Sequence, residues 1–285
     1  MRSKNSLLII VAASLVPTVV CAADMPLITA PPMLSQPASS EFEGWYLRGD
    51  VGLANAQMKR IENPDDPNLR VFNANGFGFD SAGLFGIGAG YQFNNWFRAD
   101  VTGQWRGRAS LHGSHSLPVE NSLVPGQTYV DNYSGNSSQA VVMANAYFDL
   151  GTWWCLTPYV GAGIGASYNR LTGFRDDGVN YIEGVLNNTV TYGADAGKWN
   201  LAWAVHAGLG YKVTPNTTIE LGYSYMNLGD AKTGPINSFE GLNVENGSPF
   251  AVKDITSHDV KLGVRWNFDA PSIYVPPPMA LGTKG

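Results

Sequence analysis

Ten charged side chains stand at alternate positions within otherwise apolar segments of the chain. They are Arg48, Asp50, Arg98, Asp100, Arg106, Lys212, Glu220, Asp259, Lys261 and Arg265. Because successive side chains of a β-strand point to opposite faces, these charges share one face of their strands and the apolar residues share the other. Such a set can form a network of ion pairs or line a path for ions.

An ion-pair network is the interpretation that we favour. If eight strands enclose these charges, the enclosed space is only wide enough for the side chains to fill it. Charges in that space must pair, since an unpaired buried ion costs about several kcal/mol. Alternating glycines, such as Gly86, Gly88, Gly161 and Gly163, then leave room for the Arg and Tyr side chains across the enclosure.

Two histidines lie in the motif His112-Gly113-Ser114-His115, within a long polar stretch. Imidazole nitrogens ligate haem iron and transition metals, so His112 and His115 are the candidate haem ligands of this chain. Histidines in a polar stretch are more often solvated loop residues, and this is what we expect here. The sequence therefore predicts no cofactor and no metal site.

No catalytic set emerges from the sequence. A hydrolase or acyltransferase acting on lipid would need serine, histidine and a carboxylate together near a lipid-exposed rim, and the outward positions offer no such set. The alternating glycines do not match a nucleotide-binding fingerprint, because no G-x-G-x-x-G stands at a strand-to-helix junction. We predict that the chain is not an enzyme.

Eight alternating segments position the charged residues. They span 45–54, 83–93, 96–106, 139–149, 157–168, 199–212, 217–228 and 257–268. Their apolar faces lack charged residues over the roughly nine to eleven residues that a strand needs to cross a bilayer. In 139–149 both faces are partly apolar. The pattern predicts an all-β fold, an eight-stranded antiparallel up-and-down transmembrane β-barrel.

Three short turns alternate with four long connections between these segments. The long ones run through about 55–82, 107–138, 169–198 and 229–256. Structureless loops of that length are uncommon in compact soluble domains, whereas outer-membrane barrels have short periplasmic turns and long extracellular loops. We therefore expect long extracellular loops and both termini in the periplasm.

The N-terminus carries the features of a secretory signal. Arg2 and Lys4 precede an apolar run from Leu7 to Val16, and small residues near Cys21 offer a cleavage point, so residues 1–22 are predicted to be a signal peptide. Proline-rich flanks, 23–43 and 269–285, enclose the predicted barrel domain, 44–268, and read as periplasmic linker and tail.

Composition agrees with a membrane barrel. Charged residues make up 14% of the chain, against about 25% in an average soluble domain, and aromatic residues make up 12%. The formal net charge is −5 and no basic cluster occurs. Nucleic acid is therefore not an expected partner.

Four stretches together carry a family resemblance. They are Thr157–Gly165, Met143–Leu150, Leu221–Tyr225 and Val264–Phe268. They resemble the small porin-family or opacity-type outer-membrane β-barrels, surface antigens similar to the OmpA transmembrane domain, over residues 44–268. The resemblance implies an eight-stranded barrel in the cell envelope with a surface-exposed structural or host-contact role. Some relatives are reported to bind haemin.

These observations lead to one functional hypothesis and two alternatives. The chain is expected to be an integral outer-membrane barrel with a structural envelope role and a surface interaction role. The alternatives are a surface receptor for haem or a host ligand, and a narrow-pore porin for small solutes. Expected partners are outer-membrane lipid, lipopolysaccharide, the outer-membrane assembly machinery and a host-surface or haem ligand bound through the loops.

Overall fold

The computed structural model describes residues 43–63, 73–116, 128–182, 185–238 and 247–268. The predicted signal peptide, 1–22, and the predicted proline-rich flanks, 23–43 and 269–285, lie outside this part of the chain apart from Glu43. Within the described ranges no helix is long and apolar enough to cross a membrane.

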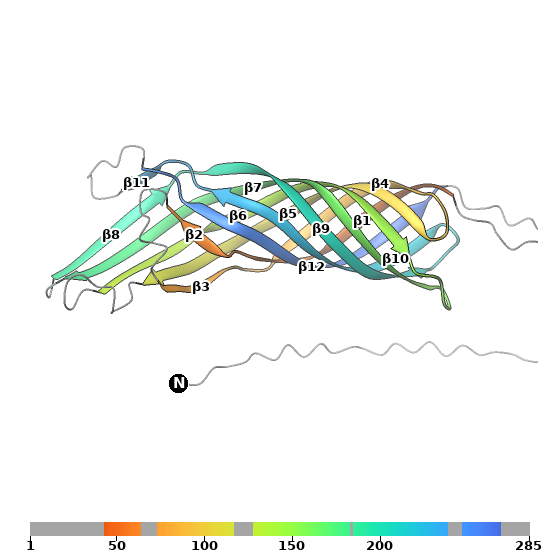
Figure 1. The fold of residues 1–285 in the computed structure, drawn as a ribbon, viewed down its shortest axis with the longest axis horizontal. Helices are drawn as coiled ribbons and strands as arrows, with labels where there is room; N and C mark the ends of the chain where they lie inside the picture. Colours follow the sequence, from red (N-terminus) through yellow and green to blue (C-terminus); the bar gives the residue numbers. More distant parts are fainter. Residues whose placement is uncertain (1–42, 64–72, 117–127, 183–184, 239–246, 269–285) are drawn as a thin grey trace, which may run out of the picture. The chain divides into compact units, whose positions relative to one another are not determined.

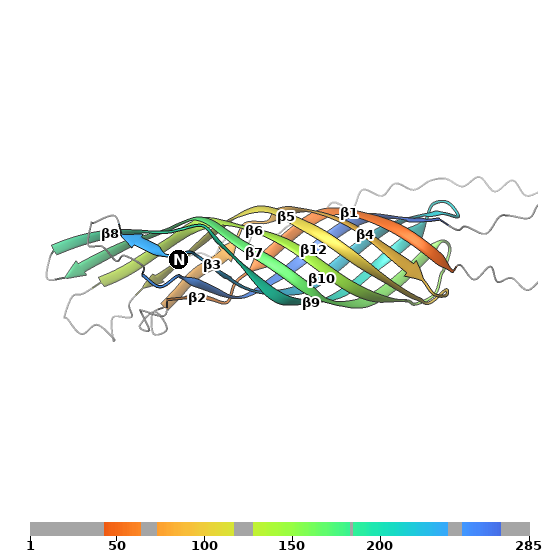
Figure 2. The same cartoon turned by 90° about the horizontal axis from the view of Figure 1, so that it is seen from above.

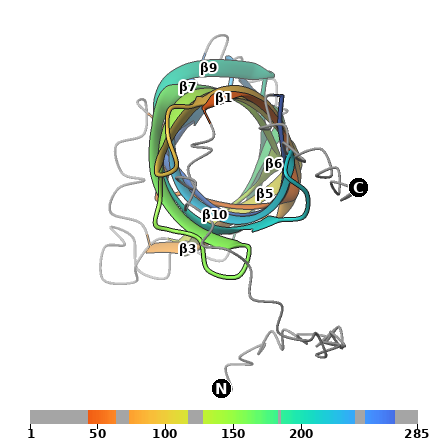
Figure 3. The same cartoon turned by 90° about the vertical axis from the view of Figure 1, so that its right-hand side faces the viewer.

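Eight strands close into a ring, seen end-on in Figure 3. They are β1 (Gly44–Gln57), β4 (Ala82–Gln92), β5 (Phe97–Ser116), β6 (Thr128–Asp149), β7 (Leu156–Ile182), β9 (Ala196–Lys212), β10 (Thr217–Lys232) and β12 (Ala251–Asn267). Each pairs antiparallel with the next of these strands in chain order, and β1 pairs with β12 to close the ring. The predicted ring of eight antiparallel strands is confirmed, and we call it the barrel.

Side chains alternate between the outside and the inside of the barrel. In β1, Trp45 and Leu47 are 60% and 50% exposed, whereas Tyr46 and Arg48 are buried. Exposed large apolar side chains from the ring strands form an outer apolar band, which includes Leu47, Val51, Leu53, Phe85, Ile87, Val101, Val142, Ile164, Leu201, Leu221, Val260 and Leu262. Contiguous apolar surface of this extent marks contact with a membrane or another protein.

The three predicted short turns share one end of the barrel, the short-turn end. They join β4 to β5, β6 to β7 and β9 to β10. Asn94 shapes the first turn, because its side-chain oxygen accepts hydrogen bonds from the backbone N–H groups of Trp96 (3.0 Å) and Phe97 (2.7 Å). In the third turn, the Thr214 hydroxyl accepts one from the N–H of Thr217 (3.0 Å).

Aromatic rings edge the outer apolar band on both sides. At the short-turn end, consecutive ring centroids lie 5.1 to 5.4 Å apart in the series Trp45, Tyr91, Phe93, Phe97 and Phe148. At the other edge, Tyr168 packs on Trp199 and Trp203 packs on Tyr225. Such girdles are typical of the two interfaces between membrane and water.

The opposite end of the barrel, the long end, corrects the expectation of long loops. Much of the four long connections is strand: β5, β6 and β7 continue far past the predicted segments, and short strands join them (Figures 1 and 2). These are β2 (Arg60–Glu62), β3 (Asn73–Phe79), β8 (Val185–Gly193) and β11 (Ile236–Ser238). β7 has 27 residues, or about 90 Å of strand, against the roughly nine to eleven residues that cross a bilayer.

Bulges change the phase of the alternation where strands leave the outer apolar band. In β7 the buried positions step by three residues, from Leu171 to Phe174, across Gly173 at φ +59°. Gly229 in β10 (φ +73°) and Asp254 in β12 (φ +53°) mark similar steps. An extra residue shifts which side chains face inward, so the alternation of the predicted segments does not continue across these points.

The interior of the barrel has two layers. Toward the short-turn end it is charged, and toward the long end it is apolar. The apolar layer includes Met58, Ile61, Phe79, Leu111, Tyr133, Val141, Met143, Leu171, Phe174, Met226, Leu228, Phe250 and Ile255. Val141 and Met143 of β6 face this layer, which explains why both faces of the predicted segment 139–149 are partly apolar.

Candidate functional site

Glu220 of β10 lies at the centre of the charged layer. Its Oε1 is 3.1 Å from Nε of Arg265 and 3.4 Å from Nη1 of Arg98, and its Oε2 is 3.6 Å from Nη2 of Arg48. All four side chains are at most 7% exposed. One carboxylate therefore faces three guanidinium groups, each from a different strand.

Further carboxylates balance these arginines. Arg48 donates to Asp50 (2.8 Å) and to Asp100 (3.1 Å), and Arg98 Nε donates to Asp149 (3.2 Å). Asp149 was not among the residues singled out from the sequence, although it occupies an inward position at the end of segment 139–149. The layer is thus an ion-pair network rather than a row of isolated charges.

Tyrosine rings fill the space around the network. The guanidinium carbon of Arg98 lies 4.4 Å from the ring centre of Tyr147 and 4.8 Å from that of Tyr159. The Tyr147 hydroxyl accepts a hydrogen bond from Arg48 (3.1 Å). At Gly161 an added Cβ would lie 2.5 Å from the Tyr147 ring, so this glycine makes room for a tyrosine. Tyr147 is its partner on the neighbouring strand and not, as predicted, a residue across the barrel.

Four predicted members lie apart from the Glu220 cluster. Arg106 pairs with Asp259 (2.6 Å) beside the apolar layer, and the Ser257 hydroxyl also donates to Asp259 (2.6 Å). Lys261 is buried, with no ion pair within 4 Å among the described residues. Lys212 does not belong to the network: it is exposed, because β9 reaches the rim of the barrel there.

A serine, a histidine and an asparagine meet inside the barrel, a contact that sequence reasoning missed. His206 Nδ1 lies 2.8 Å from Ser224 Oγ, and His206 Nε2 lies 3.1 Å from Asn145 Oδ1. The Asn145 amide donates to Asp100 Oδ1 (2.8 Å), which leaves its oxygen to accept from His206. All are buried, so we interpret the set as a hydrogen-bonded link across the lumen. The signal in the sequence was that each of the three residues occupies an inward position of its predicted segment.

The two candidate haem ligands do not face one ligand. His115 is buried against the rings of Phe77 and Tyr133 and lies 3.1 Å from the Tyr133 hydroxyl, so the expectation that it is a solvated loop residue is wrong. His112 points outward, with its Nδ1 3.9 Å from Asp80. A spacing of three residues places side chains on opposite faces of a strand. No three His, Cys, Asp or Glu side chains of the described ranges are placed to hold a metal.

A half-buried carboxyl group lies inside the long end. Burial raises the pKa of Asp176 to about 8, and the neighbouring Asp131 and Asp177 add to the effect. Asp176 lines a cavity of about 220 Å³ with Thr191, Ile236 and Phe250 among the other walls. The group is therefore protonated over much of the neutral range.

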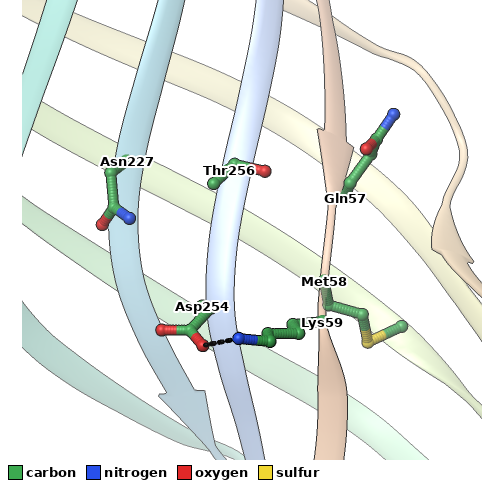
Figure 4. Close-up of a pocket in the computed structure, with 6 residues that line it drawn as sticks. All are labelled: Gln57, Met58, Lys59, Asn227, Asp254 and Thr256. Carbon is green, nitrogen blue, oxygen red and sulfur yellow. Dashed lines mark ion pairs between the residues drawn. The ribbon is translucent and has the colours of Figure 1, made fainter.

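A groove opens on the outer face just beyond the outer apolar band. It measures about 460 Å³ and is lined by Gln57, Met58, Lys59, Asn227, Asp254 and Thr256, as Figure 4 shows. Lys59 Nζ points to Asp254 Oδ2 at 3.8 Å. The groove is polar, and its cation already has a carboxylate partner.

Comparisons with known proteins agree with this architecture. A family model described as "Outer membrane protein beta-barrel domain" matches residues 27–268. An uncharacterized protein of Brucella abortus is 29% identical and covers 89% of this chain and 95% of its own length. Outer membrane protein PagN of Salmonella typhimurium is 26% identical, with coverage of 81% and 92%.

Two further similarities are more distant. A putative adhesin of Rickettsia prowazekii is 23% identical and covers 78% of this chain and 86% of its own length. Among solved structures, the outer membrane protein OprG of Pseudomonas aeruginosa aligns with a TM-score of 0.46 and 15% identity, covering 80% of this chain and 97% of that one.

Proposed function

Because this chain belongs to the outer membrane protein β-barrel domain family, it is an outer-membrane protein, and we propose that it is a structural barrel whose long end serves as an adhesive surface. The extension of β5 to β8 beyond the outer apolar band carries this proposal. A barrel that only spanned the membrane would not need a strand of 27 residues.

The proposed orientation puts the short-turn end in the periplasm and the long end outside the cell. Barrels of this membrane have short periplasmic turns and longer extracellular segments. The first residues of β1 and the last residues of β12 lie at the short-turn end. The proline-rich flanks would then be periplasmic, and the β7–β8 hairpin would project from the cell surface.

The hairpin of β7 and β8 presents an apolar outer face that fits a contact role. Tyr181 pairs with Leu186 across the hairpin, and Arg175 pairs with Tyr192. We call Val179, Tyr181, Leu186 and Tyr192 the hairpin patch; Leu186 is 59% exposed and the other three are 38% to 44% exposed. Aromatic residues with a neighbouring arginine are common anchors of protein interfaces.

The interior supports this role better than either alternative from the sequence. The ion-pair network and the apolar layer fill the lumen, which argues against a pore for solutes. His112 and His115 face opposite sides of β5, which argues against a paired haem site. The similarity to a putative adhesin of Rickettsia prowazekii supports contact with a host surface.

Adherence of intact bacteria tests the proposal. We would express the protein in a non-adherent host and compare it with a Tyr181→Ser, Leu186→Ser, Tyr192→Ser triple variant. The control is Gln57→Ser with Thr256→Ser, which changes outer-face residues of the Figure 4 groove. We expect the triple variant to lose most binding to epithelial monolayers and immobilised matrix proteins, with surface levels matched. Equal adherence of wild type and triple variant would overturn the adhesive role.

A further inference from the structure

Two arginines flank a serine on the outer face of β5, β6 and β7. Ser138 of β6 pairs in register with Arg170 of β7. On the other side, the register of β5 and β6 shifts between Arg106 and Ala109, so that the bulge containing Arg108 stands opposite Ser138. Both arginines are exposed.

These residues line a groove of about 340 Å³. Its walls are Trp105, Arg108, Ser138, Arg170, Thr172 and Asp195. Neighbouring strands lie about 4.8 Å apart, so the backbones of the two arginines are about 10 Å apart. Two guanidinium groups at that spacing can converge on one phosphate, with Ser138 and Thr172 hydroxyls as further donors.

The groove lies at the depth of lipid headgroups. Trp105, one of its lining residues, is level with Tyr168, because both pair in register with Ala140. The Tyr168 ring packs on Trp199, with 5.1 Å between the ring centroids. These rings belong to the girdle at the long-end edge of the outer apolar band. Aromatic girdles sit at the level of the headgroups, so the arginines one step beyond them face that layer.

The charge of the groove is not balanced within the described part of the chain. Asp195 Oδ2 is 3.6 Å from Arg170 Nη2, while its Oδ1 accepts a hydrogen bond from Gly173 N (3.0 Å). Arg108 has no ion pair within 4 Å among the described residues. The groove of Figure 4 differs, because Lys59 there faces Asp254. An anion is therefore expected between Arg108 and Arg170.

A second cleft lies on β6 and β7, farther toward the short-turn end than the groove. It measures about 390 Å³, and its walls include Ala144, Ala146, Ala162 and Ile164, which face the lipid side. Ala144 is six residues from Ser138 along β6, or about 20 Å of strand, about 15 Å in depth for a tilted barrel strand. That distance suits an acyl chain attached to a headgroup held above.

We propose that β5, β6 and β7 form a site for one phosphorylated glycolipid of the outer leaflet. Its phosphate binds between Arg108 and Arg170, and an acyl chain lies in the alanine-lined cleft. The proposal rests on the orientation proposed above, because only the long end meets the outer leaflet. It does not rest on adhesion, since the hairpin patch lies elsewhere on the chain.

Lipid titration of the purified full chain in non-ionic detergent tests the site. The probes are lipid A with both phosphates, lipid A with its phosphates removed, and inorganic phosphate. We expect Arg108→Gln with Arg170→Gln to weaken binding of phosphorylated lipid A about tenfold or more, because each lost charge-assisted hydrogen bond is worth about that factor. The control, Lys59→Gln with Arg60→Gln, removes the same charge beside Asp254, which lies 3.8 Å from both side chains. It should leave affinity within about threefold.

Several outcomes would overturn the site. These are unchanged affinity in the Arg108 and Arg170 variant, equal loss in the control, or displacement of lipid A by inorganic phosphate at equal affinity. Wild-type binding of dephosphorylated lipid A as tight as that of lipid A would also refute it. Heat-modified migration in gels checks that each variant is folded. Unchanged lipid binding in the Arg108 and Arg170 variant, with adherence lost in the hairpin-patch variant, would refute this site alone. Weakened lipid binding in the first variant, with adherence unchanged in the second, would refute only the adhesive role.

Discussion

At the residue scale, the interior of the barrel depends on one carboxylate that faces three arginines. Sequence reasoning found Glu220 and its partners because strict alternation reveals which charges point inward. It could not reveal which charges meet, since that depends on strand stagger: Arg48 reaches Asp100, 52 positions away in the chain. The alternation also assigned Lys212 to the inside, although the enclosed space ends before that residue.

Replacing Glu220 with glutamine should destabilise the barrel strongly. The change leaves Arg48, Arg98 and Arg265 facing one another without their shared carboxylate, and breaking a buried ion pair from one side costs about 3–5 kcal/mol. Unfolding in urea, followed by tryptophan fluorescence in lipid vesicles, measures the loss. Asp177→Asn is the control, because its exposed pair with Arg175 contributes little. Equal stability of the two variants would contradict the network.

Acid should stabilise the long end around Asp176. Its pKa is about 8 in the folded chain against an ordinary 3.8, so between these values the folded state holds a proton that the unfolded state lacks. Stability therefore rises as pH falls from about 8.5 toward 4. Hydrogen exchange of β7 and β8, corrected for intrinsic rates, should show greater protection at pH 6 than at pH 8.5. Asp176→Asn should abolish the difference, and a pH effect that persisted in it would refute the assignment.

At the element scale, the alternation of apolar and polar residues predicts the strands only where lipid enforces it. The predicted segment 45–54 corresponds to β1, Gly44–Gln57, and the predicted segment 83–93 corresponds to β4, Ala82–Gln92. Beyond the outer apolar band, charged residues such as Arg175 and Asp177 stand among the outward apolar residues. Bulges at Gly173 and Gly229 also change the phase of the alternation. For this reason the sequence predicts loops where β5, β6 and β7 extend beyond the outer apolar band.

A pair of leucine substitutions separates lipid contact from ordinary exposure. Leu221 and Leu186 are 54% and 59% exposed, but Leu221 lies in the outer apolar band and Leu186 in the hairpin patch. Leu221→Arg should cost about 2–4 kcal/mol of folding free energy in bilayers, because a charge enters the hydrocarbon. Leu186→Arg should have little effect. Similar costs at both positions would mean that the band does not face lipid.

At the scale of the whole molecule, closure of the ring and filling of its interior go together. Pairing of β1 with β12 leaves no open edge in the membrane, where unsatisfied backbone groups cost about several kcal/mol each. An eight-stranded barrel is only wide enough for side chains to fill it. The side chains inside this barrel are charged toward the short-turn end and apolar toward the long end. The sequence alone does not predict the two layers. Charged and apolar inward residues both alternate with lipid-facing residues, so the alternation does not distinguish one layer from the other.

The filled interior predicts no steady conductance. Purified protein in a planar bilayer should give no large ohmic steps, since both layers of side chains block the lumen. A variant with Glu220→Gln provides the comparison, because loosening the charged layer leaves the apolar layer in place. Porin-sized steps from the wild type would favour the pore alternative and make the inward charges determinants of ion selectivity.

The orientation and the surface role rest on which end of the barrel faces outward, and the reactivity of Cys155 measures this directly. Cys155 is exposed in the turn between β6 and β7, at the short-turn end. On intact cells an impermeant maleimide should leave wild-type Cys155 unlabelled and should label Asn188→Cys, in β8, on a Cys155→Ser background. Permeabilised cells should label both. Labelling of Cys155 on intact cells, with Asn188→Cys protected, would contradict the account.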